Sequence, residues 1–273
     1  MCGRYVASRD PEGLAEEFEV DETAGDGPGE DPAAAQPNYN VAPTAAVPVV
    51  LERHEPAVRW LRLLTWGLVP SWSRDRGSGG RMINARAESL LDRPAYRRPA
   101  LARRCLVPAD GWYEWQRLGA GTAGAARRGR AKQPFHIHPV DGAPIAFAGI
   151  YEFWRDPELP KDDPGSWLTT FAILTVPAEQ GLAAVHDRMP LVLPRDRWAA
   201  WLDPAQRDPD AVLALTGPPP PGRFVAVPVS SRVNSVANND PELLRPIPTP
   251  GSAPASVDPV TGEILGGPDT PLF

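Results

Sequence analysis

Short apolar runs, separated by segments rich in proline and glycine, set the hydrophobic pattern of this chain of 273 residues. The 35 prolines and 24 glycines interrupt the sequence too often for long helices. The runs are rich in β-branched and aromatic residues, which is typical of strands. They predict strands over residues 46–51, 59–67, 104–107, 112–116, 134–138, 145–154, 169–176, 191–193 and 224–228.

Helical patterns are fewer and short. They cover residues 11–18, with Asp10 as the N-cap candidate, and residues 87–91, 195–202 and 210–215. Many strands with scattered helices predict an α+β fold, a single domain around an antiparallel, barrel-like β-sheet with flanking short helices.

Composition divides the chain into a folded part and several flexible parts. We expect one domain over residues 1–247 and a Pro/Gly-rich, poorly ordered tail over residues 248–273. Within the domain, residues 21–37, 118–131 and 156–166 are expected to be flexible insertions, because they are acidic or of low complexity.

Charge and cysteine content narrow the function classes. No apolar stretch reaches 18 residues and the N-terminus lacks an apolar signal core, so neither a membrane span nor a secretion signal is expected. Two cysteines give no disulfide framework, which favours the cytoplasm. The net charge of −6 argues against a general polyanion binder. However, nine arginines against three acids between Arg74 and Arg104 form either a phosphate-binding face or an ordinary solvated surface.

Cys2 is the most informative single residue. Methionine before a small residue is usually trimmed, which would leave Cys2 with a free α-amine and a thiol on one residue. Both groups are partly nucleophilic near neutral pH. Such an aminothiol captures an aldehyde as a Schiff base and closes a five-membered thiazolidine through sulfur. Alone, a cysteine at this position is as well explained by a frayed terminus.

Six short segments are unusual together. They are Cys2-Gly3-Arg4-Tyr5, Tyr39-Asn40-Val41-Ala42-Pro43, Trp66-Gly67-Leu68-Val69-Pro70, Ile83-Asn84-Ala85-Arg86-Ala87-Glu88, Asp110-Gly111-Trp112-Tyr113-Glu114-Trp115 and His186-Asp187-Arg188-Met189-Pro190. In this order and spacing the chain resembles the SRAP family (SOS response-associated peptidase-like proteins) over most of residues 1–246.

The resemblance implies a protein that senses abasic sites in single-stranded DNA, in the context of replication and the SOS response. It would crosslink to the ring-opened sugar through a thiazolidine on Cys2. By the same resemblance, Glu114 helps to open the sugar ring, His186 assists Schiff-base formation, and Asn84 orients the amine of Cys2. An apolar setting would raise the pKa of Glu114, and imidazole suits a proton shuttle at neutral pH.

DNA contacts are expected around these four residues. Arg4, Arg86 and Arg188 are candidates for holding phosphates, because arginine pairs with phosphate in a two-point fork. The resemblance also places Asn40, Pro43 and Thr175 along the strand or the pocket, and offers Trp72 and Trp115 for base stacking. Trp66 is the tryptophan most expected in the core. After Trp72 the chain carries Ser73 and a loop rich in arginine and glycine, where many relatives have a second aromatic residue.

Rival functions remain open at this point. His136 and His138, joined by His186, could form a metal site, but no established zinc spacing is present, so we expect no metal and no cofactor. Cys2 with His186 and Glu114 or Asn84 could instead form a cysteine-type peptidase that at least removes Met1. The third alternative is a non-covalent module for single-stranded DNA. We expect a monomer, with replication-fork proteins as possible further partners and with the nucleoid as its location when bound to DNA.

Overall fold

Five strands of the computed structural model close into a barrel in the order β10–β4–β3–β6–β9, and β9 returns to β10. They are β3 (Ala46–Arg53), β4 (Val58–Trp66), β6 (Arg104–Ala109), β9 (Ile145–Arg155) and β10 (Trp167–Pro177). The structure describes residues 2–23, 35–53, 57–117, 132–247, 256–257 and 264–265. The predicted α+β barrel is confirmed, but its sheet is mixed, because β4 and β10 run parallel with Thr65 opposite Thr170.

Two short strands extend the barrel sheet along β10. β5 (Asn84–Arg86) pairs with it in parallel and β11 (Arg188–Pro190) pairs with it in antiparallel, so both follow the second half of β10. The prediction of a strand at 191–193 is therefore wrong, because the observed strand β11 lies three residues earlier in the chain. The run Leu191–Leu193 is buried, but only Val192 forms an isolated bridge, to Phe147.

A second sheet has the order β14–β13–β12–β8–β7–β1–β2. Its strands are β1 (Tyr5–Ala7), β2 (Asn38–Val41), β7 (Gly111–Arg117), β8 (Lys132–Pro139), β12 (Phe224–Pro228), β13 (Ser256–Val257) and β14 (Ile264–Leu265). Gly111 permits the close pairing of β7 with β8, because a Cβ there would lie 2.5 Å from the Ile137 carbonyl oxygen.

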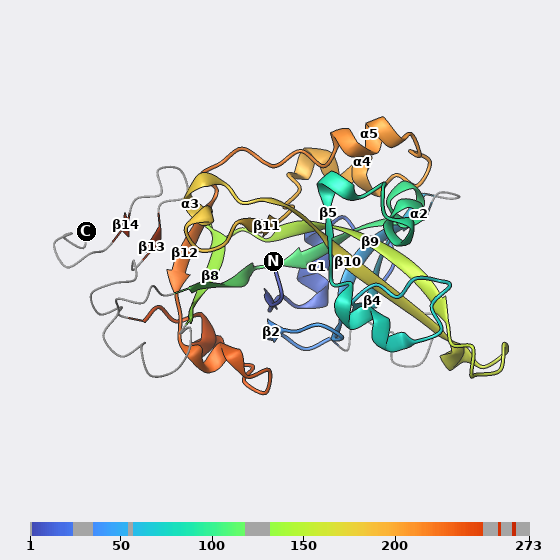
Figure 1. The fold of residues 1–273 in the computed structure, drawn as a ribbon, viewed down its shortest axis with the longest axis horizontal. Helices are drawn as coiled ribbons and strands as arrows, with labels where there is room; N and C mark the ends of the chain where they lie inside the picture. Colours follow the sequence, from blue (N-terminus) through green and yellow to red (C-terminus); the bar gives the residue numbers. More distant parts are fainter. Residues whose placement is uncertain are drawn as a thin grey trace.

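Short helices flank the sheets. The α-helices are α1 (Pro11–Glu17), α2 (Pro94–Ala102), α3 (Gln180–Ala183), α4 (Trp198–Leu202) and α5 (Pro209–Ala214); α2, α4 and α5 gather on one side of the barrel (Figure 1). The 3₁₀ turns are η2 (Arg76–Arg81), η3 (Ala87–Ser89), η5 (Pro164–Ser166), η6 (Arg195–Arg197), η7 (Ser231–Asn234) and η8 (Pro241–Leu244).

The predicted helices were mostly placed correctly. The helices predicted at 11–18 and 210–215 are confirmed as α1 and α5, and 195–202 is η6 followed by α4. The helix predicted at 87–91 is only the 3₁₀ turn η3. α2 was not predicted, because its sequence carries Pro99 and two adjacent arginines. Asp10 caps α1 as expected, accepting a hydrogen bond from the Gly13 amide at 2.8 Å.

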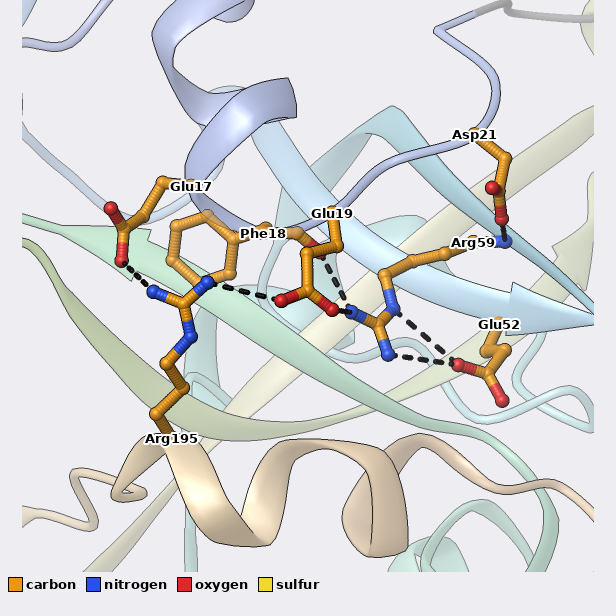
Figure 2. A network of polar contacts seen from close by, with 7 residues as sticks. All are labelled: Glu17, Phe18, Glu19, Asp21, Glu52, Arg59 and Arg195. Carbon is orange, nitrogen blue, oxygen red and sulfur yellow. Dashed lines mark hydrogen bonds and ion pairs between the residues drawn. The ribbon is translucent and has the colours of Figure 1, made fainter.

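The acidic segment that follows α1 is held by two arginines (Figure 2). Arg195 binds Glu17 and Glu19, each at 3.1 Å, and the Arg59 guanidinium donates to the Phe18 carbonyl at 2.8 Å. The Phe18 ring stacks on Trp198 with centroids 4.6 Å apart. Part of the acidic charge near the N-terminus is therefore used to fasten α1 against the barrel.

The expected insertions and tail are only partly described. Residues 118–131 lie outside the described residues, as does most of 21–37, whereas 156–166 forms turns that end in η5. In the tail the structure describes β13 and β14, which continue the second sheet beyond β12. None of the helices in the described ranges is long and apolar enough to cross a bilayer.

Candidate functional site

The first residues of the chain lie between the two sheets. On one side, the Tyr113 amide of β7 donates to the Arg4 carbonyl at 2.9 Å. On the other side, Asn84 Nδ2 of β5 donates to the Cys2 carbonyl at 2.8 Å. Asn84 is fixed by pairing with Ile173 and by the Tyr96 hydroxyl, which donates to its carbonyl at 3.1 Å. In Figure 1 the amino end accordingly lies near the middle of the molecule.

The Cys2 side chain is fully buried, and its thiol lies 3.7 Å from the Arg4 carbonyl oxygen. Burial raises the pKa of the Cys2 thiol well above its usual range, and the negative charge of Glu114 raises it further. The charge of the amino terminus acts in the opposite direction. At neutral pH the sulfur is therefore a protonated thiol.

Glu114 lies on β7 with only 2% of its surface exposed. Burial raises the pKa of its carboxyl to about 7, against the positive charge of the amino terminus and a hydrogen bond from it, which lower the pKa. A carboxyl with this pKa is present in both protonation states near neutrality, so it can give or take a proton there.

His186 follows α3, which is tied to β7 through Gln116 Nε2, a donor to the Ala184 carbonyl at 3.0 Å. The Arg188 backbone amide donates to His186 Nδ1 at 3.0 Å, and the exposed Asp187 carboxylate lies 2.9 Å from the same nitrogen. The pKa of His186 is lowered, first by burial and next by the amino-terminal charge. The lowered pKa keeps the ring mostly neutral at neutral pH.

The structure brings together the four residues that were predicted as catalytic. The charge of the amino terminus, which belongs to the Met1 amine here, acts on the pKa values of Cys2, Glu114 and His186, and Asn84 binds the backbone of Cys2. The Asn84 side-chain oxygen is buried, and it has no hydrogen-bond partner among the residues that the structure describes. It is therefore available to accept a hydrogen bond from an amine at this place.

Arg188 is already engaged. Its guanidinium binds Glu88 at two points and donates to the Thr175 carbonyl at 2.6 Å and to the Thr175 hydroxyl at 3.1 Å. Thr175 itself is fully buried. A phosphate could reach Arg188 only by displacing Glu88, so the predicted phosphate role of Arg188 and the strand-lining role of Thr175 are both indirect in this arrangement.

Asn40 is also buried and organises a loop. Its Nδ2 donates to the carbonyls of Val233, Ser235 and Asn238 at 3.0–3.2 Å, and its Oδ1 accepts from Arg4 Nη1 at 2.8 Å. Because the side chain is fully used, a contribution of Asn40 to DNA binding would pass through this loop and through Arg4. The pKa of Arg4 is lowered by burial.

Other predicted contacts face solvent. Trp72 is 60% exposed, Arg86 is exposed, and Pro43 and Trp115 are half-buried, with the Trp115 ring N–H donating to Asn234 Oδ1 at 2.8 Å. Trp66 is fully buried, as expected of a core residue.

Most of the arginine-rich stretch is solvent-exposed. Seven of its nine arginines are exposed, and none of these forms an ion pair within the described part of the chain: Arg74, Arg76, Arg81, Arg86, Arg93, Arg97 and Arg98. The other two are structural. Arg103 pairs with Glu152, and Arg104 is buried, where it donates to the Trp201 and Ala100 carbonyls. The basic face therefore begins at Arg74 and ends at Arg98.

The histidine pair does not assemble a metal site. The rings of His136 and His138 stack at 4.9 Å, and burial lowers the pKa of His136 to about 3. Across the described ranges, no group of three or more His, Cys, Asp or Glu side chains is placed to hold a metal ion. His136 packs against Tyr113, with ring centroids 5.4 Å apart.

Two contributors to the site were missed from the sequence. Glu88 stands in the quoted segment that contains Asn84 and Arg86, but its partner Arg188 is 100 residues away. Tyr96 donates a hydrogen bond to the Asn84 carbonyl, and it lies between arginines in α2, the helix that was not predicted. The one signal for Glu88 in the sequence was its place two positions after Arg86 in the quoted segment.

Comparisons with known proteins identify a matching family and several relatives. A family model described as SOS response associated peptidase (SRAP) matches residues 1–236. The chain is 36% identical over 244 residues to the abasic site processing protein YoqW of Bacillus subtilis, covering 89% of this chain and 99% of that protein. It is 33% identical over 256 residues to the abasic site processing protein YedK of Escherichia coli, covering 90% and 100%.

One more distant relative and one solved structure also match the chain. The abasic site processing protein HMCES of Gallus gallus is 33% identical over 241 residues, covering 78% of this chain and 67% of that protein. A crystal structure of a protein from Bacteroides thetaiotaomicron has a TM-score of 0.72 at 23% identity, covering 90% of this chain and all of that one. Together with the family match, these similarities show that the chain belongs to the SOS response associated peptidase (SRAP) family.

Proposed function

We propose that this chain captures abasic sites in single-stranded DNA covalently, through a thiazolidine on Cys2 formed after Met1 has been removed. Relatives at 33–36% identity are named abasic site processing proteins, which supports the substrate class. The finer chemistry is argued from the four residues around the amino end.

The reaction needs two additions to one aldehyde carbon. The α-amine of Cys2 attacks the aldehyde of the ring-opened deoxyribose, and loss of one water gives a Schiff base. The Cys2 thiol then adds across the carbon–nitrogen double bond, its proton passes to nitrogen, and a five-membered ring closes. The net change is one new C–N bond and one new C–S bond for one water released.

Each neighbouring residue has a task in this sequence. Glu114, with a pKa of about 7, protonates the sugar ring oxygen as the ring opens and then accepts a proton from the amine. The neutral His186 assists the loss of water from the intermediate as a proton shuttle. The Asn84 side chain orients the amine without titrating.

The observation that carries the proposal is the direct link between Asn84 and Cys2, combined with the near-neutral pKa of the buried Glu114. An aminothiol needs an unprotonated amine and a proton donor at the same place, and a carboxyl that titrates near pH 7 meets both needs.

We further propose that the strand is held by exposed and half-buried groups around this site. Arg86 and Arg4 would bind the phosphates beside the lesion, and Trp72, Trp115 and Pro43 would contact the bases. Asn40, Thr175 and Arg188 would support these contacts from beneath. The cytoplasmic location, the monomeric state and any replication-fork partner remain predictions.

Intact-protein mass spectrometry tests the proposal. The purified protein is measured before and after incubation with an oligonucleotide that carries one abasic site. The expected result is loss of Met1 and then a mass gain equal to the oligonucleotide less one water. Cys2→Ala should give no stable gain, and Cys2→Ser should stop at a Schiff base that borohydride can trap. A stable adduct on Cys2→Ala would refute the proposal.

A peptidase is the second candidate, since the family description names one and Cys2 lies with Glu114 and His186. The raised pKa of the Cys2 thiol disfavours it, because a peptidase attacks through a thiolate. Cleavage of unrelated peptides that is lost in Cys2→Ala would favour the peptidase. Salt-sensitive binding that does not distinguish an abasic strand from an intact one would favour a non-covalent module.

A further inference from the structure

A separate pocket of about 320 Å³ opens beside the barrel, where β4 ends and the glycine-rich turn η2 folds back against it. None of the four residues of the candidate active site lines this pocket. Its volume is within the range of small-molecule sites in proteins and is sufficient for one planar heterocycle.

The lining combines apolar and polar groups. Val69 and Leu168 supply apolar surface, and Thr44 and Thr65 bring hydroxyls that form no hydrogen bond within the part of the chain described here. Arg76 also lines the pocket and forms no ion pair with any described residue. Apolar walls with a few free polar groups and one cation suit a nucleobase attached to a phosphate.

The pocket is built rigidly. A Cβ on Gly67, which has φ +119°, would lie 2.6 Å from the Gly79 carbonyl oxygen, so only glycine allows η2 to approach β4 this closely. Thr44 has φ 73°, a costly conformation for a β-branched residue, and its amide donates to the Trp66 carbonyl at 2.8 Å. Such strain persists only where the surrounding structure fixes it, so the Thr44 wall has a defined position.

The pocket and the proposed reaction centre lie at neighbouring levels of β10 but on opposite faces of the sheet, because an odd number of residues separates Thr170 from Ile173. Along β10, Thr170 pairs with Thr65 of the pocket and Ile173 pairs with Asn84 of the active site. Three residues of strand separate the two levels, which is about 10 Å. Pro43 precedes Thr44 directly, so a predicted DNA contact adjoins the pocket in the chain.

We propose that this pocket takes the base of a nucleotide that flanks the abasic site, with the phosphate of that nucleotide on Arg76. This inference rests on the proposed function and extends it, because it gives the protein a sensor for an intact nucleotide next to the lesion. The arginine- and glycine-rich loop that follows Trp72 then encloses one base. This contact takes the place of part of the base stacking that a second aromatic residue would provide.

This inference can be tested with the full chain by placing an unreactive abasic residue, here called the spacer, at successive positions of the oligonucleotide. Oligonucleotides carry one reactive abasic site and, at one further position, a reduced and unreactive abasic residue that lacks a base. The spacer is moved one position at a time on both sides of the lesion, and adduct formation is measured against DNA concentration. At one position we expect the half-saturating concentration to rise roughly tenfold, the effect of losing one stacked base.

Gly80 provides the matched variants. It lines the pocket, and a Cβ there would meet nothing within 4 Å, so Gly80→Leu fills the space and Gly80→Ala hardly does. Gly80→Leu should abolish the dependence on the spacer, and Gly80→Ala should retain it. Arg76→Gln should weaken binding and reduce its salt dependence, whereas Arg74→Gln, a change of an exposed arginine outside the pocket, should do neither.

The outcomes separate this inference from the proposed function. If wild-type protein forms the adduct equally well with every spacer, or if Gly80→Leu keeps the wild-type dependence, the pocket proposal is overturned while the crosslinking proposal stands. If no adduct forms at all, the crosslinking proposal fails. The pocket is then judged by non-covalent binding of a lesion-free strand, where Gly80→Leu alone should bind roughly tenfold more weakly; equal binding by Gly80→Leu and Gly80→Ala would overturn it.

Discussion

Arg188 and Glu88 face each other in a two-point ion pair, with Nη1 2.6 Å from Oε1 and Nη2 3.0 Å from Oε2. Glu88 lies in the turn that follows β5, which carries Asn84, and the Arg188 amide holds the His186 ring. The pair thus joins the segment that carries Asn84 to the segment that carries His186. We infer that Glu88 is a positioning residue for the crosslinking reaction.

Replacing Glu88 tests this link. Glu88→Gln should slow adduct formation roughly tenfold at saturating DNA, because small misplacements of reacting groups are costly. The same variant should lose less than about 1 kcal/mol of stability, since Glu88 is half exposed. Glu17→Gln, which breaks a similar exposed pair with Arg195, is the matched control and should leave the rate unchanged. Tighter DNA binding by Glu88→Gln at an unchanged rate would instead mean that Glu88 merely competes with phosphate for Arg188.

Glu114→Gln should separate stability from activity. The folded protein holds the pKa of Glu114 near 7, above the ordinary carboxyl value, so the folded state binds more protons than the unfolded state between about pH 4.5 and 7. Stability is lost as the pH rises through this window. Removing the charge should therefore stabilise the protein by about 1–3 kcal/mol at pH 8 and by little at pH 4.5.

Urea unfolding of both proteins across pH 4.5–8 gives the comparison, and the same samples should show adduct formation reduced at least a hundredfold in Glu114→Gln. An unchanged stability difference across this pH range would mean that the carboxyl is not desolvated as described.

Arg86 is the arginine expected to meet phosphate directly, because it is exposed next to the site and forms no ion pair within the described ranges. Arg86→Gln should reduce the slope of log affinity against log salt by about 0.7 for single-stranded DNA. Fluorescence anisotropy with a lesion-free oligonucleotide measures this slope between 50 and 200 mM salt, roughly the range in which such contacts weaken markedly. Arg207→Gln, at an exposed arginine elsewhere in the chain, is the control; an equal loss there would point to general charge instead of a contact.

His136 should make the fold acid-sensitive. Burial beside His138 lowers the pKa of His136 to about 3, so between pH 6.5 and 3 the unfolded state binds the additional proton. Stability due to this residue is present above pH 6.5 and is lost as the pH falls, at up to about 1.4 kcal/mol per pH unit. His136→Phe should flatten this dependence while keeping the ring contacts with Tyr113 and His138.

Thermal unfolding of His136→Phe and wild-type protein from pH 7 to pH 4 measures the effect, with His138→Phe as the control. The prediction fails if the two variants show the same pH dependence.

The barrel could be predicted because its strands carry continuous apolar runs, and eight of the nine predicted strands overlap observed ones. The parallel pairing of β4 with β10 could not be predicted, because more than 100 residues separate Thr65 from Thr170 and no local pattern encodes their register. The apolar run Leu191–Leu193 misled the prediction, since burial made it resemble a strand while the backbone pairing falls on Arg188–Pro190.

The candidate site, like the fold, could be predicted from the sequence only in part. Cys2, Glu114 and His186 were indicated by the family resemblance of six short segments taken together, and the structure brings them to one place. What the sequence could not reveal is which polar groups are already satisfied. Asn40 and Arg188 stay predicted DNA contacts, but the sequence did not reveal that their side chains already bind the loop 233–238 and Glu88, far away in the chain.

The burial of Cys2 has a consequence for how the protein survives in an oxidising or alkylating environment. Peroxides and electrophiles attack the thiolate, and a thiol whose pKa is raised by burial offers almost none. In the proposed reaction, the Cys2 thiol therefore stays unmodified until an aldehyde reaches the α-amine of the same residue. Its selectivity depends on access and on the adjacent amine, so the protein can remain competent under the same chemical stress that damages its proposed substrate.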